Sequence, residues 1–198
     1  MGTAGAATME GLAASDPRTR ILDAALALMS ESGSAGASMR QLAAACGLNV
    51  ATIYHYFPSK ADLLHSVMAE RRYGERLSSE APELDLTVPP RERLVGLLEW
   101  LWENALGEEA VWRLLVGEAL RGEEAATSNA SELVEALAAT LEVWLADGFP
   151  ELTGDLGAMA RVIRGQVFAL VVEHLALGAV TPDVARIRAE ELAAIVFP

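Results

Sequence analysis

Residues 38–60, which read SMRQLAAACGLNVATIYHYFPSK, decide the fold of this chain. Ser38 is followed three residues later by Gln41, which is the spacing of a capping box. A helix is therefore expected to begin at Met39. Gly47 supplies the left-handed backbone position that ends such a helix.

A second helix is expected directly after this turn. Asn49 is a preferred N-cap residue, and residues 50–56 carry the helical pattern. Two helices joined by so short a turn must cross steeply, which leaves the second one projecting as a ridge. This is the pattern of the helix-turn-helix, whose second helix can enter the major groove of DNA.

Composition excludes several other kinds of protein. Of the 198 residues, 52% are hydrophobic, which is enough for a sizeable core. One cysteine cannot form an internal disulfide, and three scattered histidines leave no cluster spaced for zinc. The most apolar segment, residues 162–180, is interrupted by Arg164, Glu173 and His174, so it does not read as a membrane span. We expect a cytoplasmic protein with no cofactor, no metal and no membrane partner.

The net charge of −13 is unevenly distributed. Residues 1–72 contain six basic and six acidic side chains, so the entire excess of acid falls in the rest of the chain. Only the first part is therefore expected to tolerate a phosphate backbone. Residues 1–14 lack the basic residues of a signal peptide and are expected to form a disordered arm.

Caps, breaks and apolar periodicity predict an all-α fold of about nine helices. Before the helix-turn-helix, a helix is expected over residues 17–32. After it, Ser59 and Asp62 have the spacing of a capping box, and the helix that they begin is expected to extend to about residue 77. Residues 78–90 read as a connector. Further helices are predicted over about 91–106, 108–121, 131–146, 155–177 and 181–197. The domains would be a DNA-binding domain (15–60), a connecting helix (61–77) and a ligand-binding and dimerisation domain (78–198).

The helix predicted over residues 155–177 is apolar almost all round. Opposite its main apolar face runs a stripe of mostly small residues, namely Ala158, Gly165, Ala169, Val172 and Ala176. A surface helix needs only one apolar face, so this one is expected to pack on its own core and on a second partner.

The stretch from Pro17 to Arg72 resembles the DNA-binding domain of the TetR family of bacterial transcriptional regulators. The resemblance rests on RILDAALALMSESG and on SMRQLAAACGLNVATIYHYFPSKADLL, in which the tract GLNVATIYHYFPSKADLL is the most specific part. It implies a homodimer with two helix-turn-helix heads, whose last two long helices pair with those of the partner. Ile187 and Leu192 of the last helix would then join the stripe in a dimer interface.

The resemblance also assigns roles on the second helix. Val50, Ala51 and His55 would face base edges, whereas Thr52, Tyr54, Tyr56 and Lys60 would hold phosphates. Hydrogen-bonded readout of bases then depends on Arg40, Asn49 and His55, because Val50 and Ala51 offer only apolar contacts. Ser38 could add a backbone N–H directed at phosphate.

Other interpretations of these residues remain open. Tyr54 and Tyr56 could pack in the core, and Asn49 could be only an N-cap. Lys60 could be a solvated lysine. Cys46 is expected to be a small buried residue rather than a redox sensor.

For the effector, the candidate contacts are Trp100, Trp102, Trp112, Glu118 and Trp144. Each tryptophan could instead be a core residue, and Glu118, at the edge of an apolar face, could be solvated. His174 is expected to be a hydrogen-bonded core or interface residue.

These observations predict a ligand-responsive, dimeric DNA-binding regulator, most simply a repressor that a small apolar molecule releases from a double-stranded DNA operator. The alternative is a dimeric helical protein that binds small molecules or partners without specific DNA readout. An enzyme is not expected, because no catalytic motif is present.

Overall fold

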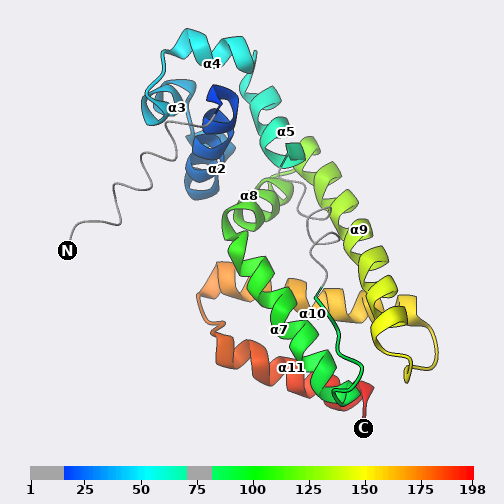
Figure 1. Ribbon diagram of the computed structural model, residues 1–198. Coiled ribbons are helices and arrows are strands. Elements are labelled where there is room, and N and C mark those ends of the chain that lie inside the picture. The colour runs from blue at the N-terminus through cyan, green and yellow to red at the C-terminus, as the bar shows by residue number, and fades with distance from the viewer. Residues whose placement is uncertain (1–15, 71–81) are drawn as a thin grey trace. The chain divides into compact units, whose positions relative to one another are not determined.

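The computed structural model describes residues 16–70 and 82–198 (Figure 1). In those two ranges the chain forms nine helices and no strand, so the predicted all-α class is confirmed. None of the described helices is both long and apolar enough to cross a membrane. The chain divides into two compact units: residues 1–71 with Arg113–Asn129, and residues 72–112 with Ala130–Pro198.

The first unit contains α2 (Pro17–Gly36), α3 (Met39–Cys46), α4 (Val50–Tyr56) and α5 (Lys60–Glu70). Helix α2 packs against both α3 and α5, and α3 against α4. The core of this unit forms where the apolar faces of the four helices meet, and it includes Ile21, Leu42, Ile53, Phe57 and Leu63. The four helices predicted for the head are thus present, with the two middle ones at the predicted positions.

Helix α2 departs from the prediction at its end. Gly33 breaks the helix as expected, with a φ of +73° that favours glycine, but one more helical turn follows it to Gly36. The break places the Ser34 backbone N–H within hydrogen-bond distance of the Glu118 carboxylate, which accepts it at 2.8 Å. The predicted continuation of α5 to residue 77, and residues 78–81 of the connector, lie outside the described residues.

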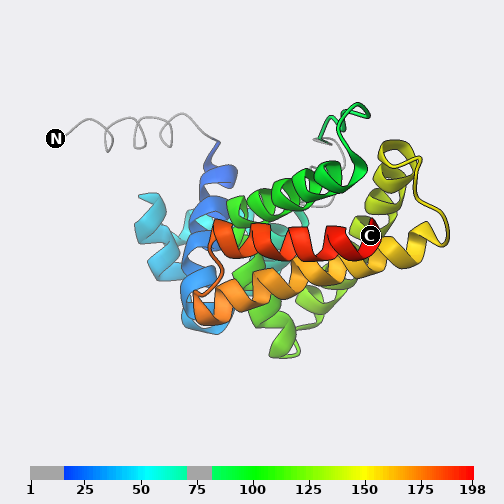
Figure 2. The ribbon, with the colours of Figure 1, turned by 90° about the horizontal axis from the view of Figure 1, so that it is seen from below.

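The second unit is built around α7 (Pro90–Gly107). Helices α10 (Leu156–Leu177) and α11 (Pro182–Val196) both pack along it, and Figure 2 shows the three side by side. Leu94, Leu97, Leu101 and Ile163 are among the buried residues at their contacts. Asp155 and Thr181, the first residues of the two predicted ranges, are the N-caps of α10 and α11, and their side chains accept the N–H groups of Ala158 and Val184.

Two helices are shared between the units: α8 (Glu109–Leu120) and α9 (Glu124–Gly148). The prediction that α9 begins at residue 131 is wrong, because the helix begins at Glu124. Its first turns are polar, which suggested a loop, but Thr127 donates both its N–H and its hydroxyl to the Glu123 carbonyl. Residues 121–123 separate the two helices, and Gly122 among them has a φ of +79°.

A buried arginine, which the sequence did not single out, connects two distant segments of the second unit. Arg93 donates to the backbone carbonyls of Gly148 and Val88 and pairs with Glu151 at 2.9 Å. Its guanidinium lies 5.2 Å from the centre of the Phe149 ring. Residues at the start of α7 are thereby joined to the segment after α9.

Candidate nucleic-acid interface and apolar cavity

Helix α3 begins with a complete capping box. The Ser38 hydroxyl accepts the N–H of Gln41 at 3.2 Å, while Gln41 Oε1 accepts the Ser38 N–H at 2.9 Å. The Ser38 N–H is therefore engaged within the protein. The N–H groups of Met39 and Arg40 lie in the first turn of α3 and have no carbonyl partner within that helix, so they are the N–H groups that could bind an anion. Gly47 ends the helix at a φ of +64°, as predicted.

Helix α4 is fixed at its start by Asn49. Its Oδ1 accepts the Thr52 N–H at 2.7 Å and the Thr52 hydroxyl at 3.0 Å. The interpretation of Asn49 as an N-cap is confirmed, and its contact with a base stays a prediction. The same bond sets the rotamer of Thr52, one of the predicted phosphate ligands.

The predicted DNA contacts divide by exposure. Arg40, Ala51, Tyr54 and His55 are exposed, whereas Val50, Thr52, Tyr56 and Lys60 are half-buried. Tyr54 is 48% exposed and therefore is not a core aromatic residue. Tyr56 packs edge-on against His55, with ring centroids 5.5 Å apart, and the neighbouring Phe57 is fully buried. One face of α4 is thus available to DNA, while Ile53 anchors the other face.

Lys60 has a structural role that the sequence did not reveal. Its ammonium group donates to the carbonyl oxygens of Ala35 at 3.2 Å and Ala37 at 2.8 Å. These carbonyls belong to the end of α2 and the residue after it, so Lys60 holds the start of α5 to the segment that leads into α3. A phosphate contact would use the remaining N–H of the ammonium group.

Cys46 is a buried residue, as expected. The Arg20 guanidinium donates to its carbonyl at 2.6 Å, and its thiol contacts the Arg20 carbonyl at 3.7 Å. Burial raises the pKa of the Cys46 thiol above its usual range, and the positive charge of Arg20 only partly opposes this shift. Such a thiol is poorly reactive.

The second unit contains an apolar cavity of about 180 Å³. Four helices, α7, α8, α9 and α10, form its walls. The lining residues are Leu101, Trp112, Val134, Leu137, Leu141, Arg164, Gly165, Val167, Phe168 and Val171. The rings of Trp112 and Phe168 meet edge-on, with centroids 6.4 Å apart. A hollow of this kind can hold a small apolar molecule.

Of the five predicted effector contacts, only Trp112 lines this cavity. Trp100 packs edge-on against Trp144 at 5.4 Å, and Trp102 against His174 at 5.6 Å. His174 in turn lies 3.1 Å from the Val180 carbonyl, in keeping with a hydrogen-bonded core residue. The sequence shows on which face of its own helix each tryptophan lies. It does not show where the packed helices leave a cavity, so it could not predict which tryptophan lines one.

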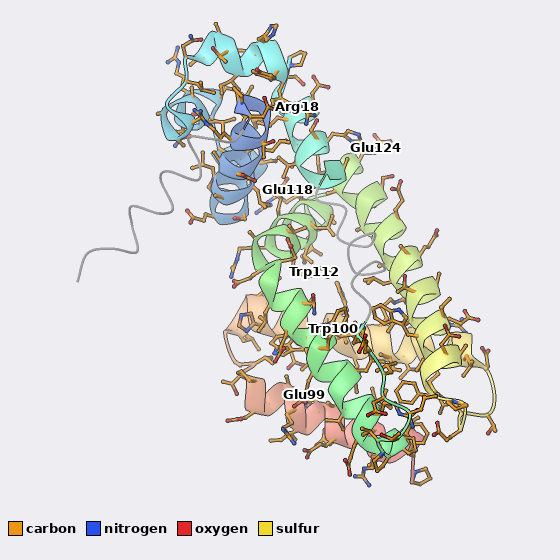
Figure 3. The ribbon with its side chains drawn as sticks, viewed as in Figure 1. Arg18, Glu99, Trp100, Trp112, Glu118 and Glu124 are labelled. Carbon is orange, nitrogen blue, oxygen red and sulfur yellow. The ribbon has the colours of Figure 1, made fainter. Side chains whose placement is uncertain are left out.

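Glu118 is buried rather than solvated, and it does not line the cavity. Its carboxylate is occupied by Ser34 and by Arg121, whose guanidinium lies at 2.7 Å. Trp112 and Glu118, both labelled in Figure 3, belong to the same helix, α8. Their surroundings nevertheless differ, because Trp112 belongs to the cavity and Glu118 to the first unit.

The predicted dimer stripe lies largely on the surface of the single chain. Gly165, Ala169, Ala176 and Ile187 are exposed, and Ala158, Val172 and Leu192 are half-buried. The large apolar side chains of Val162 and Ile195 are also exposed on α10 and α11. Exposed apolar side chains on these two helices, which both pack on α7, are available for the predicted interface.

Sequence reasoning missed Arg164 and Phe168 as cavity residues. A signal was present for Arg164, because it interrupts the most apolar segment of the chain. Its guanidinium donates to the Val134 carbonyl at 3.2 Å.

Comparison with known proteins agrees with this geometry. The family described as "Bacterial regulatory proteins, tetR family" matches residues 21–67, within the span from α2 to α5. The HTH-type transcriptional repressor KstR of Mycolicibacterium smegmatis is 33% identical over 175 residues, which cover 85% of this chain and 81% of that protein. KstR of Rhodococcus jostii is 43% identical over 77 residues, which cover 39% of this chain but only 35% of the relative.

Solved structures agree on the fold. A transcriptional regulator from Rhodococcus sp. Rha1 matches with a TM-score of 0.69 at 18% identity, and the match covers 92% of this chain and 96% of that one. At this identity the likeness shows the fold alone.

Proposed function

Because this chain belongs to the TetR family of bacterial regulatory proteins, we propose that it is a homodimeric repressor that a small, largely apolar effector releases from its DNA operator. It is a transcriptional regulator and not an enzyme. The observation that carries the proposal is the helix α4, which is fixed by caps and one buried face while its other face is exposed.

On DNA, α4 would lie in the major groove. Arg40 and His55 are exposed and carry hydrogen-bond donors for base edges, and Ala51 offers a methyl group to thymine. Tyr54, Thr52 and Lys60 would position the head on phosphates. Few side chains here can form hydrogen bonds with bases, so the shape of the operator is expected to contribute to selectivity.

Two heads are needed because a single α4 reads only a few base pairs. A dimer made through α10 and α11 would present two copies of α4 to half-sites about 34 Å, or a multiple of that, apart. The exposed stripe on those two helices supports this assembly.

The cavity supports an apolar effector. An effector can shift the repressor only if it binds one conformation more tightly than the other. By linkage, the conformation that it favours must bind DNA more weakly, and by the same factor DNA weakens effector binding.

The experiment that tests this proposal is a gel-shift assay with DNA that flanks the chain's own gene, repeated over a range of salt concentrations. We expect a specific complex that unrelated competitor DNA does not displace. Binding that is equally strong on all sequences at every salt concentration would favour the alternative, a dimeric ligand-binding protein without specific DNA readout.

A further inference from the structure

The geometry points to a definite chemical class for the effector: we infer that it is an amphiphile with an apolar body and an anionic end of the carboxylate type, bound by Arg164. This inference rests on the proposed function, because it assigns a ligand class to the same cavity. It is carried by the depth, charge and size of that cavity.

The cavity has a buried end and an open rim. Trp112 and Leu141 are only 6% and 2% exposed, and Leu101 and Val171 are equally buried. At the rim, by contrast, Phe168 is 44% and Val134 38% exposed. An elongated ligand would therefore place its apolar part among the buried residues and its other end where water can reach it.

Arg164 is the one charged residue of the ten that line this cavity. Its Nη1 donates to the carbonyl of Val134, a rim residue, which places the guanidinium at the open end. A guanidinium carries five N–H donors in a planar fork, so this hydrogen bond leaves donors that could hold the two oxygens of a carboxylate.

The same arrangement disfavours the other ligand charges. None of the described residues that line the cavity is acidic, so among them a cationic ligand would meet Arg164 without a counter-charge. A neutral ligand could accept one hydrogen bond but would not gain the stronger charge-assisted pair.

Size limits the apolar part. An apolar cavity of about 150 Å³ can hold a benzene molecule, so the 180 Å³ found here suits a body of about seven carbon atoms without rearrangement of the walls. Octanoate, with a seven-carbon chain beyond its carboxyl carbon, 1-octanol and octylammonium are therefore matched probes that differ in the charge of the head group.

The test is a titration of the full chain with each probe below its micellar concentration, followed by tryptophan fluorescence, to which Trp112 contributes from the cavity wall. We expect octanoate to bind about tenfold more tightly than 1-octanol, as one charge-assisted pair at a partly exposed site would give, and octylammonium to bind most weakly.

Substitutions then assign the preference to one side chain. Arg164→Met should abolish the preference for octanoate, whereas 1-octanol can lose at most one neutral hydrogen bond and should bind nearly as before; Arg164→Lys should keep part of the preference. Arg161→Met is the matched control, because Arg161 lies one turn earlier on α10, is exposed, is absent from the cavity wall and faces Asp155 at 3.9 Å.

Equal affinities for octanoate and 1-octanol, or an unchanged preference in Arg164→Met, would overturn the inference and leave an apolar effector standing. A failure of all three probes to bind would overturn it too. The repressor proposal is tested separately, since sequence-specific operator binding in the gel shift does not depend on any of these ligands.

Discussion

Ser34 donates both its backbone N–H and its hydroxyl to the carboxylate of Glu118, each at 2.8 Å. Glu118 is 3% exposed, and the guanidinium of Arg121, the residue directly after α8, lies 2.7 Å from its carboxylate. A buried carboxylate is thus compensated by two hydrogen bonds and one ion pair. It fixes the chain directly after the Gly33 break, at the end of α2.

Glu118→Ala should destabilise the protein by about 1–3 kcal/mol, because it leaves the half-buried Ser34 N–H without this acceptor and removes the ion pair with Arg121. Ser34→Ala, which removes only the hydroxyl, should cost about 1 kcal/mol. Urea unfolding of both single variants and of the double variant measures the coupling. Glu103→Ala, at an exposed position of α7, is the control and should have almost no effect. Additive costs for Ser34 and Glu118 would contradict the pairing.

Lys60→Ala should lower the free energy of unfolding by about 1 kcal/mol, because the carbonyls of Ala35 and Ala37 lose their shared donor. If Lys60 also contacts phosphate, the slope of log affinity against log salt should fall by about 0.9 for each head. Operator titrations at several salt concentrations measure this slope. A destabilised variant whose slope is unchanged would remove Lys60 from the phosphate contacts and leave it a purely structural role.

Arg40→Ala should relax the preference at one operator position by about 1–3 kcal/mol, as expected for the loss of a bidentate contact with guanine. Arg40 is exposed on α3, so its removal should leave the stability nearly unchanged. Competition with operators substituted one position at a time provides the measurement. Uniform weakening on every operator, with a shallower salt slope, would instead identify a phosphate contact.

Ile187→Glu should convert the proposed dimer to a monomer. Ile187 is 53% exposed on the single chain, so a glutamate there would be solvated in a monomer but buried without a partner in the proposed interface. Light scattering after size exclusion reports the mass, and operator affinity should fall with it. Val143→Glu places the same charge at an exposed apolar position of α9 and should remain dimeric. A dimeric Ile187→Glu protein would rule out this position as part of the interface.

Cys46 should make stability fall at alkaline pH. Because burial raises the pKa of its thiol in the folded protein, the thiol ionises more readily in the unfolded chain. The contribution of the neutral thiol is complete below the pKa that it has in the unfolded chain, and it is lost as the pH rises through the higher pKa of the folded protein. Unfolding at pH 7 and pH 9.5 should show a larger loss for the wild type than for Cys46→Ala. Iodoacetamide should modify Cys46 slowly until the protein unfolds.

Local signals explain why the head could be predicted from the sequence. The Ser38 capping box, the left-handed Gly47 and the Asn49 cap each act within four residues, and all three are present in the structure. Their spacing determines the helix bounds with no need for distant contacts. The same holds for Asp155 at the start of α10.

Features that depend on distant contacts could not be predicted. Arg93 reads as an ordinary residue in the first turn of a helix, and only the folded chain brings the Gly148 carbonyl to it. A Cβ at Gly148 would lie 2.3 Å from Cδ1 of Leu84, so any larger residue there would displace the end of that side chain. The cavity is similar, since several helices have apolar faces wide enough to line one and only their packing decides where space remains.

The anchoring of α4 through Ile53 has a consequence for how such a protein changes over evolutionary time. Ile53 is buried on one side of the helix, while Ala51 and His55 are exposed on the other. Substitutions at these exposed positions should cost no more than about 0.5 kcal/mol of stability. New operator preferences can therefore arise by mutation, or be introduced by design, without compensating repairs elsewhere in the fold.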